Sequence, residues 1–373
     1  TTPSAGWSLV VLPDTQYYID LRHSLWRLYW ANSTTSNNLT DIYLNQTRWV
    51  ASTSSVLGTR LAVFVGDLTQ ADSHEEWRVF EEGLGHLSQG GILYCLAQGD
   101  HDLGYEYTGV PPFVFRKAAN RKSRISRLTA AASHQPHFRG TFDGCIANAY
   151  YELPVPYFTL LVLVLEYRPR HSVLRWASHI LSARREQYAV IVTHSYLDSV
   201  SHAREAQANA TQRDGSNSIQ GNSGAALFDS LVRRHSNVFL VLCGHSDGEG
   251  YLLSRGSAPG HVVHQLLSNY QQWPRGGDGW LRVLTFDPSA DTITVRSYST
   301  YLAAHEPRSQ LVLRHCMRGP QCTATRPHVD LSQSQVWYAN QSEDAPTDAR
   351  EWLNSSQVGG GVPSLPLVQQ GLD

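Results

Sequence analysis

Short apolar runs recur along the chain without alternating with polar residues. Five of them, rich in Val, Ile, Leu and Phe, cover residues 7–12, 60–65, 91–97, 188–192 and 237–242. Unbroken apolar runs of this length are typical of strands buried on both faces, as in a sheet covered by helices. We therefore predict five core strands at these positions.

Helical periodicity appears between the apolar runs. Residues 75–87 and 172–184 each repeat apolar residues at the three- and four-residue spacing of an amphipathic helix. Alternating strands and helices predict an α/β fold, a layered β-sheet core flanked by helices. Two later runs, residues 280–286 and 292–298, alternate and are joined by a turn with Pro and Asp, which predicts a C-terminal β-hairpin.

A carboxylate or a histidine follows each of the five core runs. The turns read Pro13-Asp14-Thr15-Gln16, Gly66-Asp67, Gly99-Asp100-His101-Asp102, Thr193-His194 and Gly244-His245. One such turn is weak evidence, because Asp and Gly are ordinary turn residues. Ligands of open α/β sheets bind beyond the carboxyl ends of the strands, so five turns in order predict a metal-centred site at one edge of a central sheet.

The order of these turns resembles the calcineurin-like metallophosphoesterase superfamily, and especially its members whose first motif reads Pro-Asp-Thr-Gln. The resemblance covers roughly residues 7–301 and includes Asn269-Tyr270-Gln271 and the glycine-rich stretch 276–282. It implies a metallophosphoesterase-type domain over residues 1–305. Residues 306–373 are then a C-terminal extension.

The resemblance also implies the ligands of one or two divalent ions, with Mn, Zn, Fe, Mg and Ca as candidates. Asp14, Gln16 and Asp67 would bind the first ion, and Asp67, Asp100, His194 and His245 the second. His101, paired with Asp102, would stabilise charge on the phosphoryl group or protonate the leaving oxygen. The implied reaction is hydrolysis of a phosphomonoester or phosphodiester by a metal-activated water.

Several positions depart from the superfamily's usual motifs. Gln16 replaces a His, Asp100 replaces an Asn, Asp247 replaces the last His and Gln70 replaces the last Asp of the second motif. The first position is then almost entirely oxygen, which favours Mn²⁺, Mg²⁺ or Ca²⁺, whereas the second favours Zn²⁺, Fe or Mn²⁺. Asp247 is either a ligand or an exposed turn residue. The departures also leave open a catalytically impaired protein that serves as an extracellular binding or assembly subunit.

Composition and sequons suggest a compartment. The chain has 373 residues, 41% of them hydrophobic, and a net charge of −2, which favours neither nucleic acid nor a membrane surface. No apolar stretch reaches the length of a membrane span, and the start at Thr1 fits a mature, processed form. Six sequons predict N-glycans and a secreted or extracellular protein: Asn32, Asn38, Asn45, Asn209, Asn340 and Asn354.

Cysteines and the tail complete the sequence-based predictions. Cys316 and Cys322 are expected to form a local disulfide, Cys95 and Cys243 to lie in the core, and Cys145 is left open. The polar tail, residues 323–373, is expected to be disordered unless its small apolar clusters dock on its own domain or on a neighbouring subunit, which would allow self-assembly. The basic stretch 116–139 is either a rim that attracts phosphate or a solvated helix face.

Overall fold

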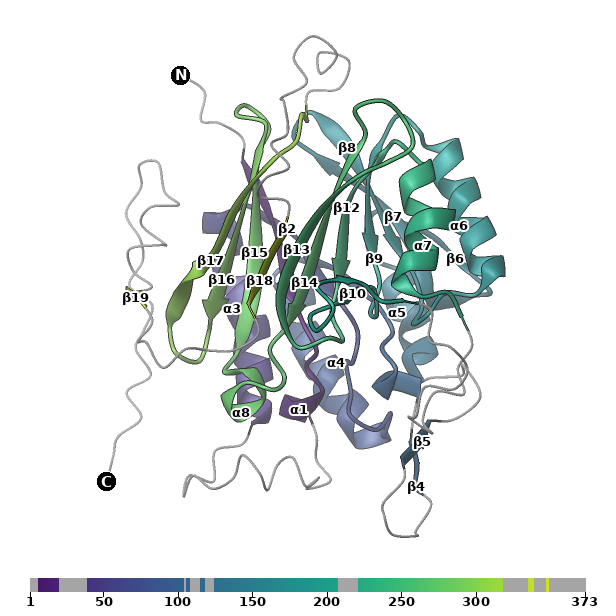
Figure 1. Cartoon of the computed structure of the whole chain (residues 1–373). Helices are drawn as coiled ribbons and strands as arrows, with labels where there is room; N and C mark the ends of the chain where they lie inside the picture. The colour runs from purple at the N-terminus through teal and green to yellow at the C-terminus, as the bar shows by residue number, and fades with distance from the viewer. Residues whose placement is uncertain are drawn as a thin grey trace, which may run out of the picture.

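Two large β-sheets lie face to face in the computed structural model, which describes residues 6–19, 39–103, 105–107, 115–117, 124–206, 221–317, 335–338 and 347–348 (Figure 1). The first sheet has the order β19-β17-β16-β15-β1-β2-β3. In that order its strands are Thr347–Asp348, Ala304–Arg314, Thr292–Ser299, Trp280–Asp287, Trp7–Leu12, Thr59–Phe64 and Leu93–Leu96. Strands β1, β2 and β3 run parallel, so their carboxyl ends meet at one edge.

The second sheet has the order β18-β13-β14-β12-β9-β8-β7-β6. In that order its strands are Gln335–Tyr338, Gly248–Arg255, Val262–Asn269, Val238–Cys243, Tyr188–Val192, Phe158–Val164, Cys145–Val155 and Phe138–Phe142. Strands β8, β9, β12 and β14 run parallel. This sheet therefore also has an edge at which carboxyl strand ends gather.

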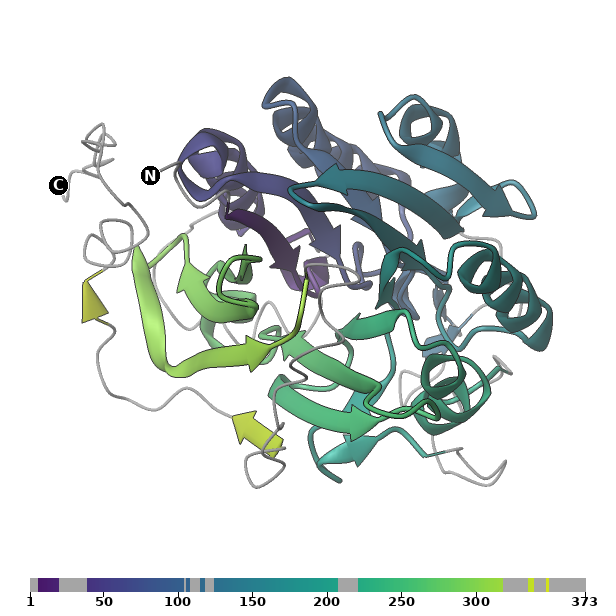
Figure 2. The same cartoon turned by 90° about the horizontal axis from the view of Figure 1, so that it is seen from above.

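Helices cover the outer faces of both sheets (Figure 2). Helices α3 (Thr40–Leu57) and α4 (His74–Gln89) pack on the first sheet, and α6 (His171–Ala183) and α7 (Gly224–Ser230) on the second. Apolar side chains of both sheets fill the space between them, including the stacked rings of Trp7 and Phe286, 3.9 Å apart. The predicted α/β layered core flanked by helices is therefore confirmed.

Local sequence signals explain where several elements begin and end. Ser73 caps α4 by accepting the backbone N–H of Glu76, whose side chain in turn accepts the N–H of Ser73. Helix α3 ends at Gly58, which takes a left-handed conformation with φ of 62°. The predicted hairpin is present as β15 and β16, which pair from Trp280 opposite Ser299 to Asp287 opposite Thr292.

Two segments of the tail add strands to the edges of these sheets. β18 pairs with β13, with Trp337 opposite Gly250, and β19 pairs with β17. For these residues the tail docks on its own chain, while the apolar clusters at 352–353 and 365–368 lie outside the described residues. The expected division between residues 305 and 306 falls inside β17, so that strand belongs to the sheet on both sides of it.

Three cysteines are free thiols in the structure. Cys95 and Cys243 are buried on core strands, as predicted, and Cys145 is partly buried. Cys322 lies outside the described residues, so the Cys316–Cys322 disulfide stays a prediction. Among the described helices, none combines the length and the hydropathy needed to cross a membrane.

Candidate metal centre

The predicted ligands follow strand ends of both sheets. Asp14, Asp67 and Asp100 come after β1, β2 and β3 of the first sheet, and His194 and His245 come after β9 and β12 of the second. The expectation that they share one edge of a single sheet is wrong, although the side chains do converge. The pattern of apolar runs is the same for strands of one sheet and of two, so it could not separate these cases.

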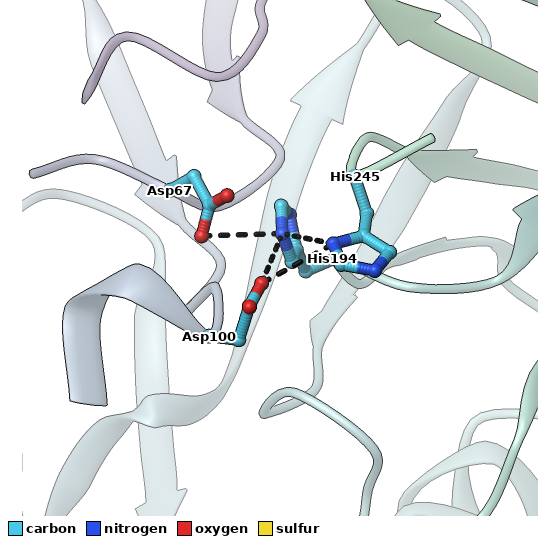
Figure 3. A group of neighbouring side chains, drawn as sticks. All are labelled: Asp67, Asp100, His194 and His245. Carbon is cyan, nitrogen blue, oxygen red and sulfur yellow. Dashed lines mark hydrogen bonds and ion pairs between the residues drawn. The ribbon is translucent and has the colours of Figure 1, made fainter. Parts of the chain in front are cut away.

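Four of these side chains face one another (Figure 3). Ligand atoms of Asp67, Asp100, His194 and His245 all lie within 4.8 Å of one another. His194 Nε2 is 3.2 Å from Asp67 Oδ1 and 3.2 Å from Asp100 Oδ1. His245 Nδ1 is 3.2 Å from Asp100 Oδ1 and from His194 Nε2. Two imidazole nitrogens and two carboxylates in this arrangement fit a divalent ion such as Zn²⁺, Fe²⁺ or Mn²⁺.

The tautomer of His194 is fixed by a backbone carbonyl that directly follows β2. Its Nδ1 lies 2.8 Å from the carbonyl oxygen of Val65, which can only accept a hydrogen bond. Nδ1 therefore carries a proton, and the lone pair of the neutral ring is on Nε2, toward the two carboxylates. The buried ring of Tyr167 flanks both histidines, with centroids 6.0 Å from His194 and 5.9 Å from His245.

The buried carboxylates and histidines of the site shift one another's pKa values. Burial raises the pKa of Asp14 well above its usual range. Burial also acts to raise the pKa of Asp67, but His194 and His101 outweigh it and lower that pKa. Burial acts to lower the pKa of His194, yet Asp67 and Asp14 raise it to about 9. A proton on His194 or a metal cation would neutralise these carboxylates, so the two compete and metal affinity should rise with pH.

The site has two halves that share Asp67. The second half is the four-residue cluster, and the first half consists of Asp14, Gln16 and Asp67, which offer carboxylate and amide oxygens. Gln16 Nε2 donates to Asp67 Oδ2 at 3.0 Å and also contacts Gln271 Oε1. Asp14 Oδ1 accepts the backbone N–H of His245 at 3.1 Å. Asp14 Oδ2 and Gln16 Oε1 are buried and have no hydrogen-bond partner among the described residues. A buried oxygen without a partner costs about 1–3 kcal/mol, and a cation at this position would offset that cost.

Glycine precedes three ligands because a side chain would collide with the site. An added Cβ would lie 2.4 Å from His194 Nδ1 at Gly66, 2.1 Å from Asp67 Oδ1 at Gly99 and 2.3 Å from Asp14 Oδ2 at Gly244. Three ligands also have left-handed backbones, with φ of 40° at Asp14, 48° at Asp67 and 72° at His245. Such conformations cost on the order of 1–3 kcal/mol each and cluster at functional sites.

His101 lies at the rim of the site, on the side of Asp67. Its backbone N–H donates to Asp67 Oδ1 at 3.0 Å, and its Nδ1 lies 3.0 Å from the carbonyl oxygen of Gln70. Its Nε2 is 4.0 Å from Asp67 Oδ2, and the side chain is 19% exposed. Because Nδ1 faces an acceptor and carries a proton, Nε2 is the atom left to exchange a proton with a substrate.

Asp102 ties together the loops that follow β2 and β3. Its carboxylate accepts the backbone N–H groups of Gly99, Leu68 and Thr69 at 2.8, 3.2 and 2.9 Å, and the hydroxyl of Thr69 at 3.1 Å. These bonds hold Asp67 and Asp100 in register with each other. The contacts give Asp102 a positioning role, and its predicted catalytic partnership with His101 stays a prediction.

Asp247 is not a member of the four-residue cluster. Asp247 Oδ1 is buried without a partner among the described residues, and burial raises the pKa of this carboxyl to about 6.

Three described arginines of the basic stretch 116–139 form ion pairs: Arg124 with Asp72, Arg127 with Glu81 and Arg139 with Glu152. For these three arginines the pairing fits a solvated surface. The side chains of the other four basic residues, Arg116, Lys117, Arg121 and Lys122, lie outside the described part of the chain, so the two alternatives stay open for them.

Gln271 is a residue of the site for which no role was predicted from the sequence. It belongs to Asn269-Tyr270-Gln271, a stretch noted only for its resemblance to the superfamily. In the structure Gln271 contacts Gln16 across 255 residues of chain. Sequence separation of this size leaves no local pattern, so only the motif itself could have pointed to this residue.

Comparison of the sequence with known proteins finds a distant relative. No family model matches the chain. An uncharacterized protein, YvnB, of Bacillus subtilis (strain 168) is 23% identical over 312 residues, which are 79% of this chain and 20% of YvnB. The chain thus spans about a fifth of the length of the curated relative it matches.

Two solved structures share the architecture. A purple acid phosphatase, PPD1, from yellow lupin (Lupinus luteus) seeds has a TM-score of 0.50 and 12% identity over 84% of this chain and 55% of its own. A dimetal phosphatase from Danio rerio has a TM-score of 0.51 and 11% identity over 83% of this chain and 99% of its own. The chain therefore shares the fold of these two phosphatases, which is the fold expected from its resemblance to the calcineurin-like metallophosphoesterases.

Proposed function

We propose that this protein is a metal-dependent phosphoesterase that hydrolyses a phosphomonoester or phosphodiester. The observation that carries the proposal is the convergence of Asp67, Asp100, His194 and His245 within 4.8 Å, beside the buried, unpartnered oxygens of Asp14 and Gln16. This donor set fits two unlike positions that share Asp67. The dimetal phosphatase from Danio rerio has the same fold, which supports the assignment.

The site residues have different roles, either in holding the metal ions or in transferring a proton. Divalent ions, when bound, polarise a phosphoryl oxygen and lower the pKa of water. Asp67 contacts both halves, through Oδ2 to Gln16 and through Oδ1 to His194, and so fixes their spacing. His101 Nε2, at the partly exposed rim, would protonate the leaving oxygen or stabilise charge on the phosphoryl group.

A metal-replacement assay tests this function. The full chain is stripped with a chelator and assayed with p-nitrophenyl phosphate and bis(p-nitrophenyl) phosphate, before and after Mn²⁺ or Zn²⁺ is added. We expect hydrolysis only with added metal, and none from an Asp67→Asn control. Metal binding without hydrolysis of either ester would favour the impaired binding or assembly subunit, an alternative motivated by Gln16 and Asp100.

We also propose that the protein is secreted and N-glycosylated. The six sequons support this, and the only one in the described residues, Asn45, is exposed on α3. The other five lie outside the described residues. Glycopeptide mass spectrometry of protein from its native source should find glycans at most sequons, and six bare asparagines would contradict secretion.

A further inference from the structure

The side-chain amide of Gln16 lies between two hydrogen-bond acceptors. Its Nε2 is 3.0 Å from the carboxylate oxygen Oδ2 of Asp67 and contacts the amide oxygen Oε1 of Gln271. Its own oxygen, Oε1, is buried without a partner among the described residues. Both hydrogens of the amide nitrogen are thus engaged, and the oxygen is left available to a ligand.

The two acceptors decide which way this amide points. The oxygen and nitrogen of an amide are almost equal in size, so the surrounding groups determine the orientation. Turning the Gln16 amide by 180° would set its oxygen against the oxygens of Asp67 and Gln271, and would replace the available oxygen with N–H donors. A donor cannot coordinate a cation.

We propose that Gln271 is a positioning residue of the first metal position, which holds the Gln16 amide so that Oε1, and not Nε2, is the ligand atom. The inference rests on the proposed function, since it concerns the same site. It also accounts for how a glutamine serves at this position, because an amide offers a ligand oxygen only when its orientation is fixed.

Hydrogen bonds also connect Gln271 to the loop of His245, in the second half of the site. Its backbone N–H donates to Asn269 Oδ1 at 2.9 Å, and Asn269 Nδ2 donates to the carbonyl oxygen of His245 at 2.9 Å. A chain of hydrogen bonds therefore runs from the loop of His245 through Asn269 and Gln271 to Gln16. The orientation of Gln16 is therefore set by Asp67, which follows β2, and by Gln271, which follows β14.

The loop that follows Gln271 packs on the helix that carries Gln16. Five successive residues, 275–279, have positive φ values of 54°, 77°, 114°, 45° and 67°. A Cβ at Gly277 would lie 2.6 Å from the hydroxyl of Tyr18, and Gly279 donates its N–H to that same hydroxyl at 2.9 Å. Tyr18 belongs to α1 (Gln16–Ile19), so the loop and this helix form one packed unit.

The test measures Mn²⁺ binding by calorimetry on the chelator-stripped full chain, with metal content checked by elemental analysis. Gln271→Met keeps the length of the side chain but removes the acceptor oxygen. We expect it to weaken one of the Mn²⁺ equivalents about 10- to 100-fold, the range typical of lost outer-shell partners, and to leave the other unchanged. Gln271→Glu keeps an acceptor and should bind at least as tightly as wild type.

Two controls separate positioning from general damage. Gln272→Met makes the same change at the adjacent, equally half-buried glutamine and should bind Mn²⁺ like wild type. In a Gln16→Ala background the Gln271→Met change should have no further effect, because the amide it orients is gone. If Gln271→Met does not fold, Gln271→Asn, whose shorter side chain withdraws the oxygen from Gln16, serves the same comparison.

The outcomes are distinct. Wild-type binding by Gln271→Met, or an equal loss with and without Gln16, would overturn the role of Gln271 and leave the proposed function standing. Failure of the wild-type chain to bind Mn²⁺ at all would overturn the proposed function and this inference with it. Selective loss that Gln271→Glu restores would establish the inference.

Discussion

The two halves of the site hold their ligand atoms by different means. In the second half, His194 is oriented by the backbone carbonyl of Val65, directly after β2, and its Nε2 lies 3.2 Å from Asp100 Oδ1. In the first half, Gln16 is oriented by the side chains of Asp67 and Gln271, and its oxygen has no partner among the described residues. A backbone carbonyl directly after a strand is held in place by the main chain, whereas a side-chain acceptor can rotate away, so the first half is the more easily perturbed.

Chemistry divides the halves in the same way. The second half has two imidazole nitrogens, which suit Zn²⁺, Fe²⁺ or Mn²⁺, and the first half has only oxygens, which suit Mn²⁺, Mg²⁺ or Ca²⁺. We therefore expect two unequal affinities, with the first position lost more readily. Asp67 joins the halves, and the predictions below begin with it.

Asp67→Asn should weaken metal binding in both halves of the site. The carboxylate meets Gln16 on one side and His194 on the other, and an amide offers less negative charge to each. We expect metal affinity to fall by more than about 100-fold at both positions, since outer-shell changes alone cost 10- to 100-fold. Elemental analysis and calorimetry measure this, and retention of either ion at wild-type affinity would show that Asp67 is not shared.

His101→Ala should leave metal ions bound in both halves of the site and still reduce turnover. The ring lies at the rim, 4.0 Å from Asp67 Oδ2 and beside the Gln70 carbonyl, and His101 is not itself a member of the four-residue cluster. Loss of a general acid costs about 10²- to 10⁴-fold, so kcat should fall by that amount while metal content stays constant. The exposed His179 of α6 provides a matched control as His179→Ala. Metal loss in His101→Ala would remove the assigned role.

Gly66→Ala and Gly244→Ala should each damage a different half. The added methyl at Gly66 would strike His194, and the one at Gly244 would strike Asp14 Oδ2. Overpacking of this kind costs about 1–3 kcal/mol, and we expect each change to weaken mainly the ion on its own side. Mg²⁺ and Zn²⁺ titrations with thermal melts compare the pair, with Gly85→Ala, which has open space around it, as the control. Identical metal profiles for both variants would contradict two separate halves.

A pH effect remote from both halves should be the smallest. Burial, aided by His264 and His261, lowers the pKa of His315 from 6.5 to about 3. The unfolded chain therefore binds a proton that the folded chain does not, and stability is lost as pH falls from about 6.5 toward 3. His315→Phe should remove about 2 kcal/mol of this loss at pH 5. Each pH unit below 6.5 costs about 1.36 kcal/mol, and pH 5 lies 1.5 pH units below it.

Chemical denaturation at pH 5 and pH 8, in chelator, isolates this effect from the metal ligands. The gain in stability of His315→Phe over wild type should be larger at pH 5 than at pH 8. His179→Gln on the surface should show the same difference from wild type at both pH values. Equal gains at the two pH values for His315→Phe would mean that packing against Phe239, rather than protonation, explains the change.

Local sequence patterns predicted several core elements and the candidate ligands. Continuous apolar runs located β1 and β9 to the residue, and the spacing of Trp77, Phe80 and Leu84 located α4, because burial on one or both faces constrains residue type locally. Carboxylates and histidines directly after strands are also local signals. Asp67, Asp100, His194 and His245 could therefore be named as a cluster before their distances were known.

How those elements meet could be seen only in the folded chain. It placed the ligands on two sheets, and it gave Asp102 four donors from the loops after β2 and β3. It also brought Gln271 against Gln16, a contact between residues 255 positions apart. Pairing between strands and contacts between distant loops depend on the packing of the whole chain, and no periodicity within a short window carries that information.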